Sequence, residues 1–405
     1  MSTLAPTNEA DLADAVRQCA SDGTPLEIAG GRTRLGLGRP VQAEKTLSSA
    51  GLSGITLYEP GALTLVARAG TPMAEIDAAL ASERQMLAFE PMDHRALLGT
   101  DGAPTIGGVV ATGTSGPRRL QRGACRDAMI GVRFVDGIGN AITNGGRVMK
   151  NVTGYDLVKL MAGTYGTLGV LSEISFKLIP APEKTVTLVS RGLSFSAAVE
   201  AFSATLGSSG EPTGAAFLPG ETGGALLRVE GLEQSVDHRI KMLRDLLAGF
   251  GTWESVEGDA SSILWQRVRD AEDLAGTSTP VWRVSVKPTD GPKLIETVAR
   301  DMPLDFVADW AGGLLWITAS QDLLEERGWR ATRERDVDAG ASALHQELQE
   351  NVDALGGHVT LVRASIPMRA AVDVFQPEDA VIQRLSAGLR QKFDPKGILN
   401  PGRMG

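Results

Sequence analysis

Cysteine is almost absent from this chain of 405 residues, which has only Cys19 and Cys125, far apart and in no CxxC pair. Iron–sulfur clusters and cysteine-rich zinc sites need several thiolates, so we expect the chain to hold neither by itself. Long apolar runs are also missing, and none reaches the roughly 20 residues that cross a bilayer. The first residues, MSTLAPTNEADLADAV, are acidic and lack the basic and apolar stretches of a signal peptide. Together these features predict a cytoplasmic protein.

Positive charge is in deficit, with 40 Lys and Arg against 49 Asp and Glu and a net charge of −9. Binding to nucleic acid depends on neutralising phosphates, so such a partner is not expected. The hydrophobic and charged fractions, 42% and 22%, are those of an ordinary globular protein. The length allows two or three domains.

Glycine is abundant: 15 of the 48 glycines fall between Gly102 and Gly169. Val, Ile, Leu, Phe and Tyr are interleaved with them, which is unlike a flexible linker. Because glycine lets the backbone approach another group closely, we interpret this region as folded backbone held near a ligand.

The first part of the chain predicts short strands and helices of an α+β fold. A helix is expected over residues 7–20 behind a Thr7/Asn8 cap, and another behind Thr71 and Pro72. A strand is expected over residues 168–180, where apolar side chains alternate. A turn-rich run, PAPEK, then marks a boundary at residues 180–184.

Beyond this boundary two βαββα-like units follow one another. They predict an antiparallel sheet with helices on one face, as in ferredoxin-like pairs. Gly312-Gly313 indicates a hairpin in the second unit. The charged run at residues 326–342 is expected to be a solvated loop. His238 and His345 lie in amphipathic, charged helices, where a surface position is expected.

Three glycine-containing stretches point to ligand binding. In EIAGGRTRLGLG, residues 27–38, a strand ends and backbone N–H groups can converge on phosphate oxygens, although a plain surface turn would explain it equally well. The others are APTIGGVVATGTSGPRR, residues 103–119, and KNVTGYDLVKLMAGTYGTLGVLSE, residues 150–173. None is a dinucleotide fingerprint of the G-x-G-x-x-G type or a P-loop.

In this order, and with the tail KFDPKGILNPGRM at residues 392–404, these stretches resemble the FAD-binding domain of the vanillyl-alcohol-oxidase type, also called the p-cresol-methylhydroxylase type. The resemblance implies FAD as cofactor. It implies Gly166 and Gly169 near the adenine half of FAD, with Val170 offering main-chain hydrogen bonds. The full set of implied cofactor-binding residues is Ala29, Gly30, Gly31, Arg32, Thr33, Arg34, Thr105, Ile106, Gly107, Gly108, Thr112, Ser115, Gly116, Gly166, Gly169, Val170 and Asn400.

The resemblance also implies an architecture. A two-subdomain FAD-binding domain would cover residues 1–180, divided near residue 55. A cap or substrate domain of ferredoxin-like units would cover residues 181–384. The last residues, 385–405, would dock back on the FAD-binding domain.

The motifs TSGPRR and VMKNVTGYDL, with the short cap, are most similar to the small FAD-binding subunits of bacterial glycolate oxidases. This likeness implies oxidation of glycolate to glyoxylate within a complex. The partners would be a larger homologous flavin subunit and an iron–sulfur subunit, which would place the complex peripherally at the inner membrane. Two alternatives stay open: a structural or electron-relay subunit without turnover, and a stand-alone dehydrogenase of another 2-hydroxy acid.

The substrate side is less clearly marked. The metal-binding block of relatives is reduced here to GGHVTLVRA, which keeps His358 and loses the other ligands, so no metal is expected. His358 is the preferred substrate-side histidine, and His94 is an alternative near the flavin. For a substrate carboxylate, Arg269 is preferred, with Arg118 and Arg119 as alternatives. Arg32 stands where some relatives link FAD covalently to histidine, which predicts non-covalent flavin.

Overall fold

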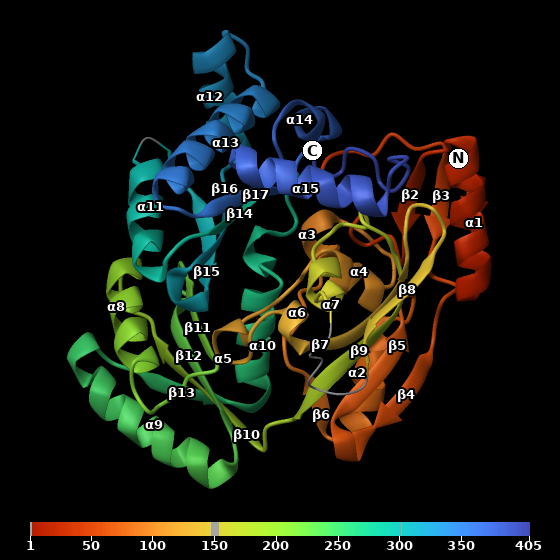
Figure 1. Cartoon of the computed structure of the whole chain (residues 1–405). Coiled ribbons are helices and arrows are strands. Elements are labelled where there is room, and N and C mark those ends of the chain that lie inside the picture. Colours follow the sequence, from red (N-terminus) through yellow and green to blue (C-terminus); the bar gives the residue numbers. More distant parts are fainter. Residues whose placement is uncertain (1, 147–153, 301) are drawn as a thin grey trace.

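The computed structural model describes residues 2–146, 154–300 and 302–405. The motif VMKNVTGYDL, at residues 148–157, therefore lies partly outside the described residues. Three sheets organise the chain, with the two smaller sheets formed by the first 180 residues and the largest by the residues that follow (Figure 1). No helix of the described ranges is long and apolar enough to cross a membrane.

The smallest sheet is parallel, in the order β1 (Ser2–Leu4), β3 (Lys45–Ser48), β2 (Leu26–Ala29). Helix α1 (Glu9–Asp22) begins where Asn8 Oδ1 accepts a hydrogen bond of 2.9 Å from the amide of Asp11. It buries Leu12 and Val16 completely, so the predicted helix and its cap are confirmed.

The second sheet is antiparallel and has the order β4 (Ile55–Glu59), β5 (Thr64–Arg68), β9 (Val170–Pro180), β7 (Met129–Val135), β8 (Ala141–Gly145). A sixth strand, β6 (Gln85–Leu87), pairs with β9. Between the strands lie short helices and one turn of 3-10 helix. These are η1 (Pro60–Ala62), α2 (Met73–Ser82), α3 (Arg95–Leu98), α4 (Ile106–Ala111), α5 (Arg119–Arg122), α6 (Cys125–Ala128) and α7 (Leu157–Met161).

The third sheet, which we call the cap sheet, confirms the two predicted units. Its first four strands lie in the order β13 (Glu254–Glu257), β10 (Lys184–Ser190), β12 (Gly224–Gly231), β11 (Gly214–Leu218), and the others follow as β15 (Asp305–Asp309), β16 (Leu314–Thr318), β14 (Val281–Ser285), β17 (His358–Arg363). The units therefore join side by side through their second strands, β11 and β15. The order within each is that of a ferredoxin-like unit.

Helices cover the outer face of the cap sheet, as predicted, and one helix covers its inner face. On the outer face are α8 (Phe195–Leu206), α9 (Glu233–Leu247), α11 (Gly291–Val298), α12 (Gln321–Thr332) and α13 (Val337–Ala354), whereas α10 (Gly258–Arg269) packs between the sheet and the N-terminal half (Figure 1). The remaining elements are η2 (Ala248–Phe250), η3 (Glu272–Leu274), η4 (Pro288–Asp290), η5 (Trp310–Gly312), α14 (Ile366–Ala371) and α15 (Ala380–Phe393).

The alternation of side chains along β14 separates the two faces. Trp282 and Val284 pack into the core beneath the outer helices, while Val281 belongs to the cluster that meets the N-terminal half. Because side chains alternate along a strand, Arg283 also faces the N-terminal half. Its neighbourhood is described below.

The end of the chain is tied to the start. Leu26 donates to the carbonyl of Ile398 at 2.7 Å, and Asn400 donates to the carbonyl of Leu26 at 2.9 Å. The Asn400 side chain accepts from the amide of Ile28 at 2.8 Å. These bonds hold the last residues beside β2. The domain limits predicted from the sequence stay predictions: those near residues 55 and 180 fall between sheets, whereas the limit at 384/385 falls inside α15.

Three expectations were wrong in detail. Pro72, and not Thr71, stands at the N-cap of α2, because Thr71 Oγ1 instead bonds the carbonyl of Arg68. The run 326–342 is helical except for the turn between α12 and α13. His345 is buried, because Trp282 donates to its Nδ1 at 3.1 Å within the cap core.

Candidate functional site

A long groove runs along the N-terminal half, and most of the residues implied for FAD line it. One part is formed by residues 28–35 with Thr105, Gly108, Thr112, Tyr165 and Asn400. A second part adds Gly107, Gly166, Gly169 and Val170, and shares Gly30, Gly108 and Tyr165 with the first. A third part reaches Ser115 and the cap, and shares Thr112 and Tyr165 with the first. Shared lining residues make the three hollows one elongated site.

Two implied residues lie outside the lining of this groove. Ile106 is fully buried in the core beneath α4. Gly116 packs behind the groove: its amide donates to Phe89 O at 2.9 Å, and a Cβ there would lie 2.2 Å from the carbonyl oxygen of Glu90. Both residues therefore shape the site from behind.

The floor of the groove requires glycine. A Cβ on Gly31 would lie 1.5 Å from the carbonyl oxygen of Ala103, and a Cβ on Gly30 would lie 2.5 Å from Thr105 Oγ1. The two glycine-containing loops are thus in backbone contact with each other. Gly108 differs, because its Cβ would stand 3.4 Å from Thr105 Oγ1 and 3.7 Å from an Arg34 nitrogen, which are ordinary contacts. A side chain at Gly108 would fit the fold but occupy the groove.

The glycines at residues 163–169 lie close to protein neighbours, and two of them also line the groove. A Cβ on Gly169 would lie 2.6 Å from the Phe134 ring, and one on Gly166 would lie 2.9 Å from Asn400 Nδ2. Gly163 lies against Gly113, whose own Cβ would be 3.3 Å from it. The missing side chains therefore allow close packing of the chain, while the backbone of Gly166 and Gly169 lines the groove.

Arg34 supplies a buried positive charge to the groove. Its Nη2 donates to Met92 O at 3.0 Å, and its buried Nε has no partner within the described structure. Burial lowers its pKa to about 10, which still leaves the guanidinium charged at neutral pH. A buried cation with free donor capacity fits an anionic group such as a pyrophosphate. Arg32, by contrast, is exposed and has a left-handed backbone, φ 61°.

Tyr165 and Asn400 close the groove. Asn400 Nδ2 donates to the carbonyl of Tyr165 at 2.7 Å, while its Oδ1 holds Ile28. Tyr165 lines all three parts of the groove. Burial raises the pKa of its phenol, which therefore stays protonated and neutral. The C-terminal segment is thus part of the site wall.

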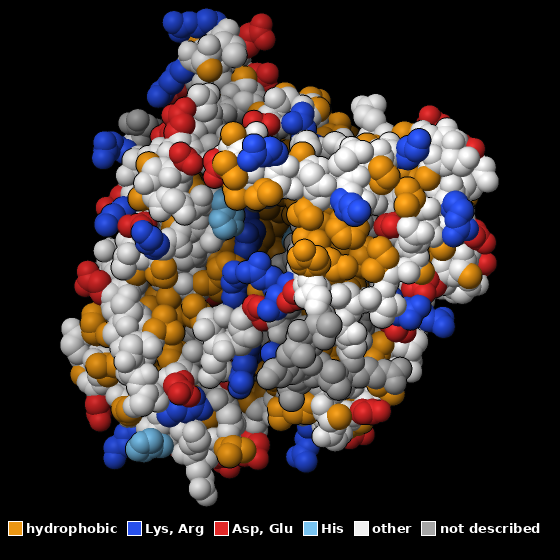
Figure 2. All heavy atoms as spheres, viewed as in Figure 1, with side chains coloured by type: hydrophobic (Ala, Val, Ile, Leu, Met, Phe, Trp, Pro, Cys, Tyr) orange, Lys and Arg blue, Asp and Glu red, His pale blue; other side chains and the backbone are white. Residues whose placement is uncertain are grey.

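The third part of the groove, which we call the cap-side hollow, lies between the two halves. The residues Thr112–Ser115, Met92 and His94 form one wall, and Arg283, Trp316 and residues 360–362 of the cap sheet form the other. In Figure 2, hydrophobic side chains surround a central depression where Arg or Lys and His side chains also lie. This hollow therefore connects the long groove with the cap sheet.

Arg283 is the functional candidate that sequence reasoning missed. No hydrogen bond or ion pair to its guanidinium occurs within the described residues, and it lies 5.2 Å from the centre of the Trp310 ring and 6.0 Å from that of Trp316. Burial lowers its pKa to about 10. A signal was present in the sequence, because a lone arginine interrupts the apolar strand PVWRVSV.

Of the two histidine candidates, His94 lines the cap-side hollow, whereas His358 is outside its lining but within reach of the charge of Arg283. His358 begins β17, and although the residue is exposed, partial desolvation of its ring together with the charges of Arg283 and Arg119 lowers its pKa. His94 is buried, lines the cap-side hollow and has an Nδ1 without a partner in the part of the chain described. Burial lowers the pKa of His94 to about 3, so its imidazole is neutral.

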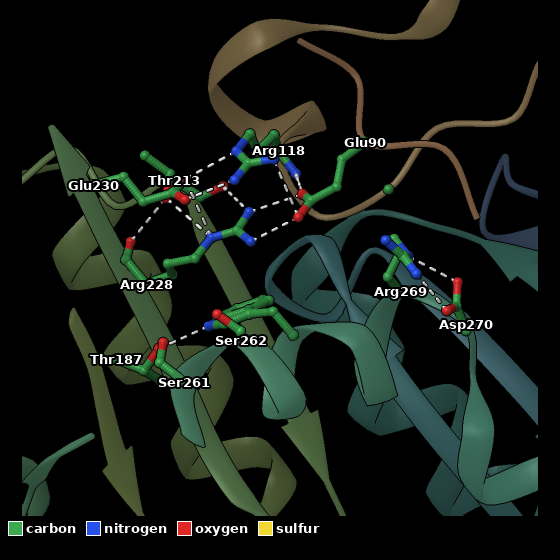
Figure 3. Close-up of polar contacts among 12 residues, drawn as sticks. Glu90, Arg118, Thr187, Thr213, Arg228, Glu230, Ser261, Ser262, Arg269 and Asp270 are labelled. Carbon is green, nitrogen blue, oxygen red and sulfur yellow. Dashed lines mark hydrogen bonds and ion pairs between the residues drawn. The ribbon is translucent and has the colours of Figure 1, made fainter. Parts of the chain in front are cut away.

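The other arginine candidates are already paired or stacked. Arg269 holds Asp270 through bonds of 2.8 and 2.6 Å (Figure 3) and lines a further hollow, which shares Arg34 with the first part of the groove and Met92 with the third. Arg118 binds Glu230 at 3.0 and 2.7 Å. Arg119 stacks on Trp310 with its guanidinium carbon 4.5 Å from the ring centre. The structure therefore favours Arg283 over Arg269 for a substrate carboxylate.

Arg228 fixes the cap to the N-terminal half. It is fully buried on β12, binds both oxygens of Glu90 at 2.8 and 2.9 Å, and lies beside Glu230 (Figure 3). The two guanidinium groups of Arg228 and Arg118 hold the pKa of Glu90 down at about 2. This network joins β12 of the cap sheet to the N-terminal half, outside the residues that line the cap-side hollow.

The groove fits a flavin dinucleotide. The groove is elongated. Its first part is lined by glycine backbone and by the buried cation Arg34, and its third part lies beneath the cap sheet. Across residues 2–146, 154–300 and 302–405, no group of three or more His, Cys, Asp and Glu side chains is arranged to hold a metal ion.

Comparison with known proteins agrees with this assignment. Residues 2–145 match the family model described as FAD binding domain. The glycolate oxidase subunit GlcE of Escherichia coli K12 is 36% identical over 97% of this chain and 96% of its own length. The glycolate oxidase subunit GlcD of Bacillus subtilis 168 is 27% identical over 99% of this chain and 88% of its own length.

Solved structures share the fold at low identity. A 4-ethylphenol oxidase from Gulosibacter chungangensis has a TM-score of 0.71 at 15% identity and covers all of this chain and 88% of its own. A substrate-bound p-cresol methylhydroxylase has a TM-score of 0.68 at 16% identity with the same coverage. The predicted α+β fold of this type is therefore confirmed, and FAD is the cofactor. The chain belongs to the family of the glycolate oxidase subunit GlcE, whose members are FAD-linked oxidoreductases.

Proposed function

We propose that this chain is an FAD-binding subunit of a glycolate-oxidase-type complex and that a small 2-hydroxy acid such as glycolate binds in its cap-side hollow. The observation that carries the proposal is Arg283, a half-buried guanidinium that faces this hollow without a carboxylate partner among the described residues. A partly desolvated cation without a counter-ion is costly, and a substrate carboxylate would neutralise it.

The two walls of the hollow would orient the substrate. Arg283 would bind the carboxylate from the cap side, since guanidinium and carboxylate match in a bidentate pair. Thr112 and Thr114, whose hydroxyl oxygens lie 2.8 Å apart, would offer neutral hydrogen bonds from the other side. The indoles of Trp310 and Trp316 beside Arg283 restrict water and favour a small ligand.

The proton of the substrate hydroxyl needs an acceptor. His358 is suited to this role because its lowered pKa leaves the imidazole neutral at pH 7 and able to take up a proton. When bound, FAD takes up the two electrons that are lost as the alcohol becomes a carbonyl. The chain's own residues would therefore orient the acid and hold its proton.

Onward electron transfer requires other subunits. Cys19 and Cys125 are both buried and far apart in sequence, so they do not form a cluster site together. We therefore propose a larger flavin subunit and an iron–sulfur subunit as partners, with the complex held peripherally at the inner membrane through them. The chain itself would bind FAD non-covalently, since arginine stands at position 32.

One alternative has an observation in its favour. His358 is the one residue kept from the metal-binding block of relatives, and no cluster of ligands surrounds it within the described residues. In this alternative, the chain would hold FAD and relay electrons while a homologous partner oxidises the substrate, so it would be a subunit without turnover. A stand-alone dehydrogenase of another 2-hydroxy acid is a third reading.

One experiment separates these functions. The purified chain, loaded with FAD, is mixed with glycolate without oxygen, and its flavin absorbance is followed with and without partner subunits. Bleaching of the chain alone supports turnover here. Bleaching that occurs only with partners supports the relay reading, and bleaching with another 2-hydroxy acid but not with glycolate changes the substrate. A chain that binds no FAD contradicts all three.

A further inference from the structure

Helix α15 lies on the surface and packs on little of the molecule. None of its 14 residues is buried, and it runs across the molecule between the cap and the N-terminal half (Figure 1). Four of its apolar side chains are largely exposed: Val381 at 56%, Ile382 at 43%, Leu385 at 58% and Leu389 at 39%. We call these four residues the α15 face.

The α15 face is a continuous stripe. At about 100° per residue, positions 381, 382, 385 and 389 fall within about 100° of arc on the helix. The charged residues inside the helix are all basic: Arg384, Arg390 and Lys392. The helix therefore combines an apolar stripe with positive charge, on a chain whose net charge is −9.

A helix of this length is not stable by itself. Isolated helices shorter than about 12–15 residues are marginal in water, and most helices in proteins gain stability by packing an apolar face. The Asp379 side chain caps the first turn of α15, accepting from Val381 and Ile382 at 2.8 and 3.1 Å, but capping does not cover the stripe. This arrangement is typical of a helix that completes its packing against another molecule.

We propose that the α15 face docks into an apolar groove, rimmed by carboxylates, on a partner subunit of the complex; the proposal rests on the function proposed above. Lys392, in line with the stripe, and Arg384, beside it, fit an acidic rim, whereas Arg390 lies on another side of the helix. A symmetric pair of two such chains would bring four cations of two α15 helices together, which argues against a second copy. An anionic bilayer is disfavoured by the overall negative charge, and the stripe has none of the aromatic anchors that interfacial helices use.

The position of α15 connects this surface with the cofactor groove. Phe375, shortly before α15, packs edge-on against Tyr165 with ring centres 5.3 Å apart. Tyr165 lines the groove from its first part to the cap-side hollow. A subunit docked on α15 would therefore sit near the groove wall, where an electron acceptor is needed.

The test uses the full chain co-expressed with the larger flavin subunit and the iron–sulfur subunit of a glycolate-oxidase-type complex. The variant is Leu385→Gln with Leu389→Gln. The matched control is Leu232→Gln with Ile263→Gln, which changes two cap residues of 65% and 63% exposure. Bound FAD per chain and the melting temperature are measured for each protein before co-purification is scored.

We expect wild type and control to co-purify with the partner subunits. The variant should co-purify at least ten-fold less partner while it keeps its FAD. Equal co-purification of the variant would overturn the proposal, as would a wild-type chain that holds FAD but binds neither subunit. Binding to phosphatidylglycerol vesicles, or a dimer in sedimentation, that is lost only in the variant would assign α15 to a bilayer or to a second copy. A chain without FAD would instead contradict the proposed function.

Discussion

The Arg228 guanidinium on the cap donates to both carboxylate oxygens of Glu90 on the N-terminal half, at 2.8 and 2.9 Å. Arg118 approaches the same carboxylate within 3.2 Å. The pair is largely buried, and it joins β12 of the cap sheet to the N-terminal half. The position of the cap over the groove therefore depends on a charge contact that cannot be exchanged for water without cost.

Replacement of Arg228 should destabilise the protein strongly. Arg228→Met leaves Glu90 buried beside only one cation, and we expect a loss of about 3–5 kcal/mol in the free energy of unfolding, measured by urea denaturation. The control is Arg267→Met, which breaks the more exposed pair with Asp273 and should cost less than about 1 kcal/mol. Equal losses of unfolding free energy for the two variants would show that the buried pair stabilises the protein no more than the exposed pair does.

The buried carboxyl of Asp309 should make stability depend on pH. Burial raises its pKa to about 7 from 3.8, so the folded state binds this proton more tightly than the unfolded state. Its contribution to stability is therefore full below about pH 3.8 and is lost as the pH rises towards 7. Compared with Asp309→Asn, the wild-type free energy of unfolding should fall by up to about 1.4 kcal/mol per pH unit between pH 5 and 6.5. Parallel curves for the two proteins would refute the raised pKa.

A side chain at position 108 should leave the stability of the cofactor-free protein unchanged but should weaken the binding of FAD. We expect Gly108→Val to keep the melting temperature of the cofactor-free protein while it weakens FAD binding at least ten-fold, because its Cβ meets only ordinary contacts and stands in the groove. FAD titration followed by fluorescence measures this. Gly61→Val, with open space around its Cβ, is the control. Unchanged FAD affinity in Gly108→Val would place the cofactor elsewhere.

The flavin should be released completely when the protein is denatured. Arg32 occupies the position where a covalent histidine would stand, and the next histidine in the sequence is His94. After precipitation with acid, we expect all yellow colour in the supernatant and none on the polypeptide. Flavin fluorescence that stays with the chain on a denaturing gel would contradict this.

The cofactor groove could be predicted from the sequence because its parts are short backbone motifs. Gly31 and Gly107 are needed where two main chains touch, and Gly30 is needed where the chain lies against the Thr105 hydroxyl, so these glycines mark the groove in the sequence. The repeated units of the cap were also readable, since alternation and turns are local features. The tail lies beside the groove, where the Asn400 side chain accepts from the amide of Ile28.

The substrate side could not be predicted in the same way. Arg269 and Arg283 are both arginines in apolar surroundings, and only the three-dimensional arrangement shows that Asp270 neutralises the first and that the second faces a hollow. His345 seemed exposed because its helix is charged, yet Trp282 from a distant strand buries it. Contacts between segments that are distant in the sequence determine whether these side chains are buried or paired, and local sequence patterns do not predict such contacts.

The account depends most on the claim that FAD and a small carboxylate bind side by side, with Arg283 holding the acid. The direct test is a titration of the FAD-loaded chain with oxalate, a carboxylate that cannot be oxidised as an alcohol, followed by the change in the flavin absorption spectrum. We expect similar affinity in wild type and Arg269→Met, and at least ten-fold weaker binding in Arg283→Met. Unchanged binding in Arg283→Met, or a loss confined to Arg269→Met, would contradict the account.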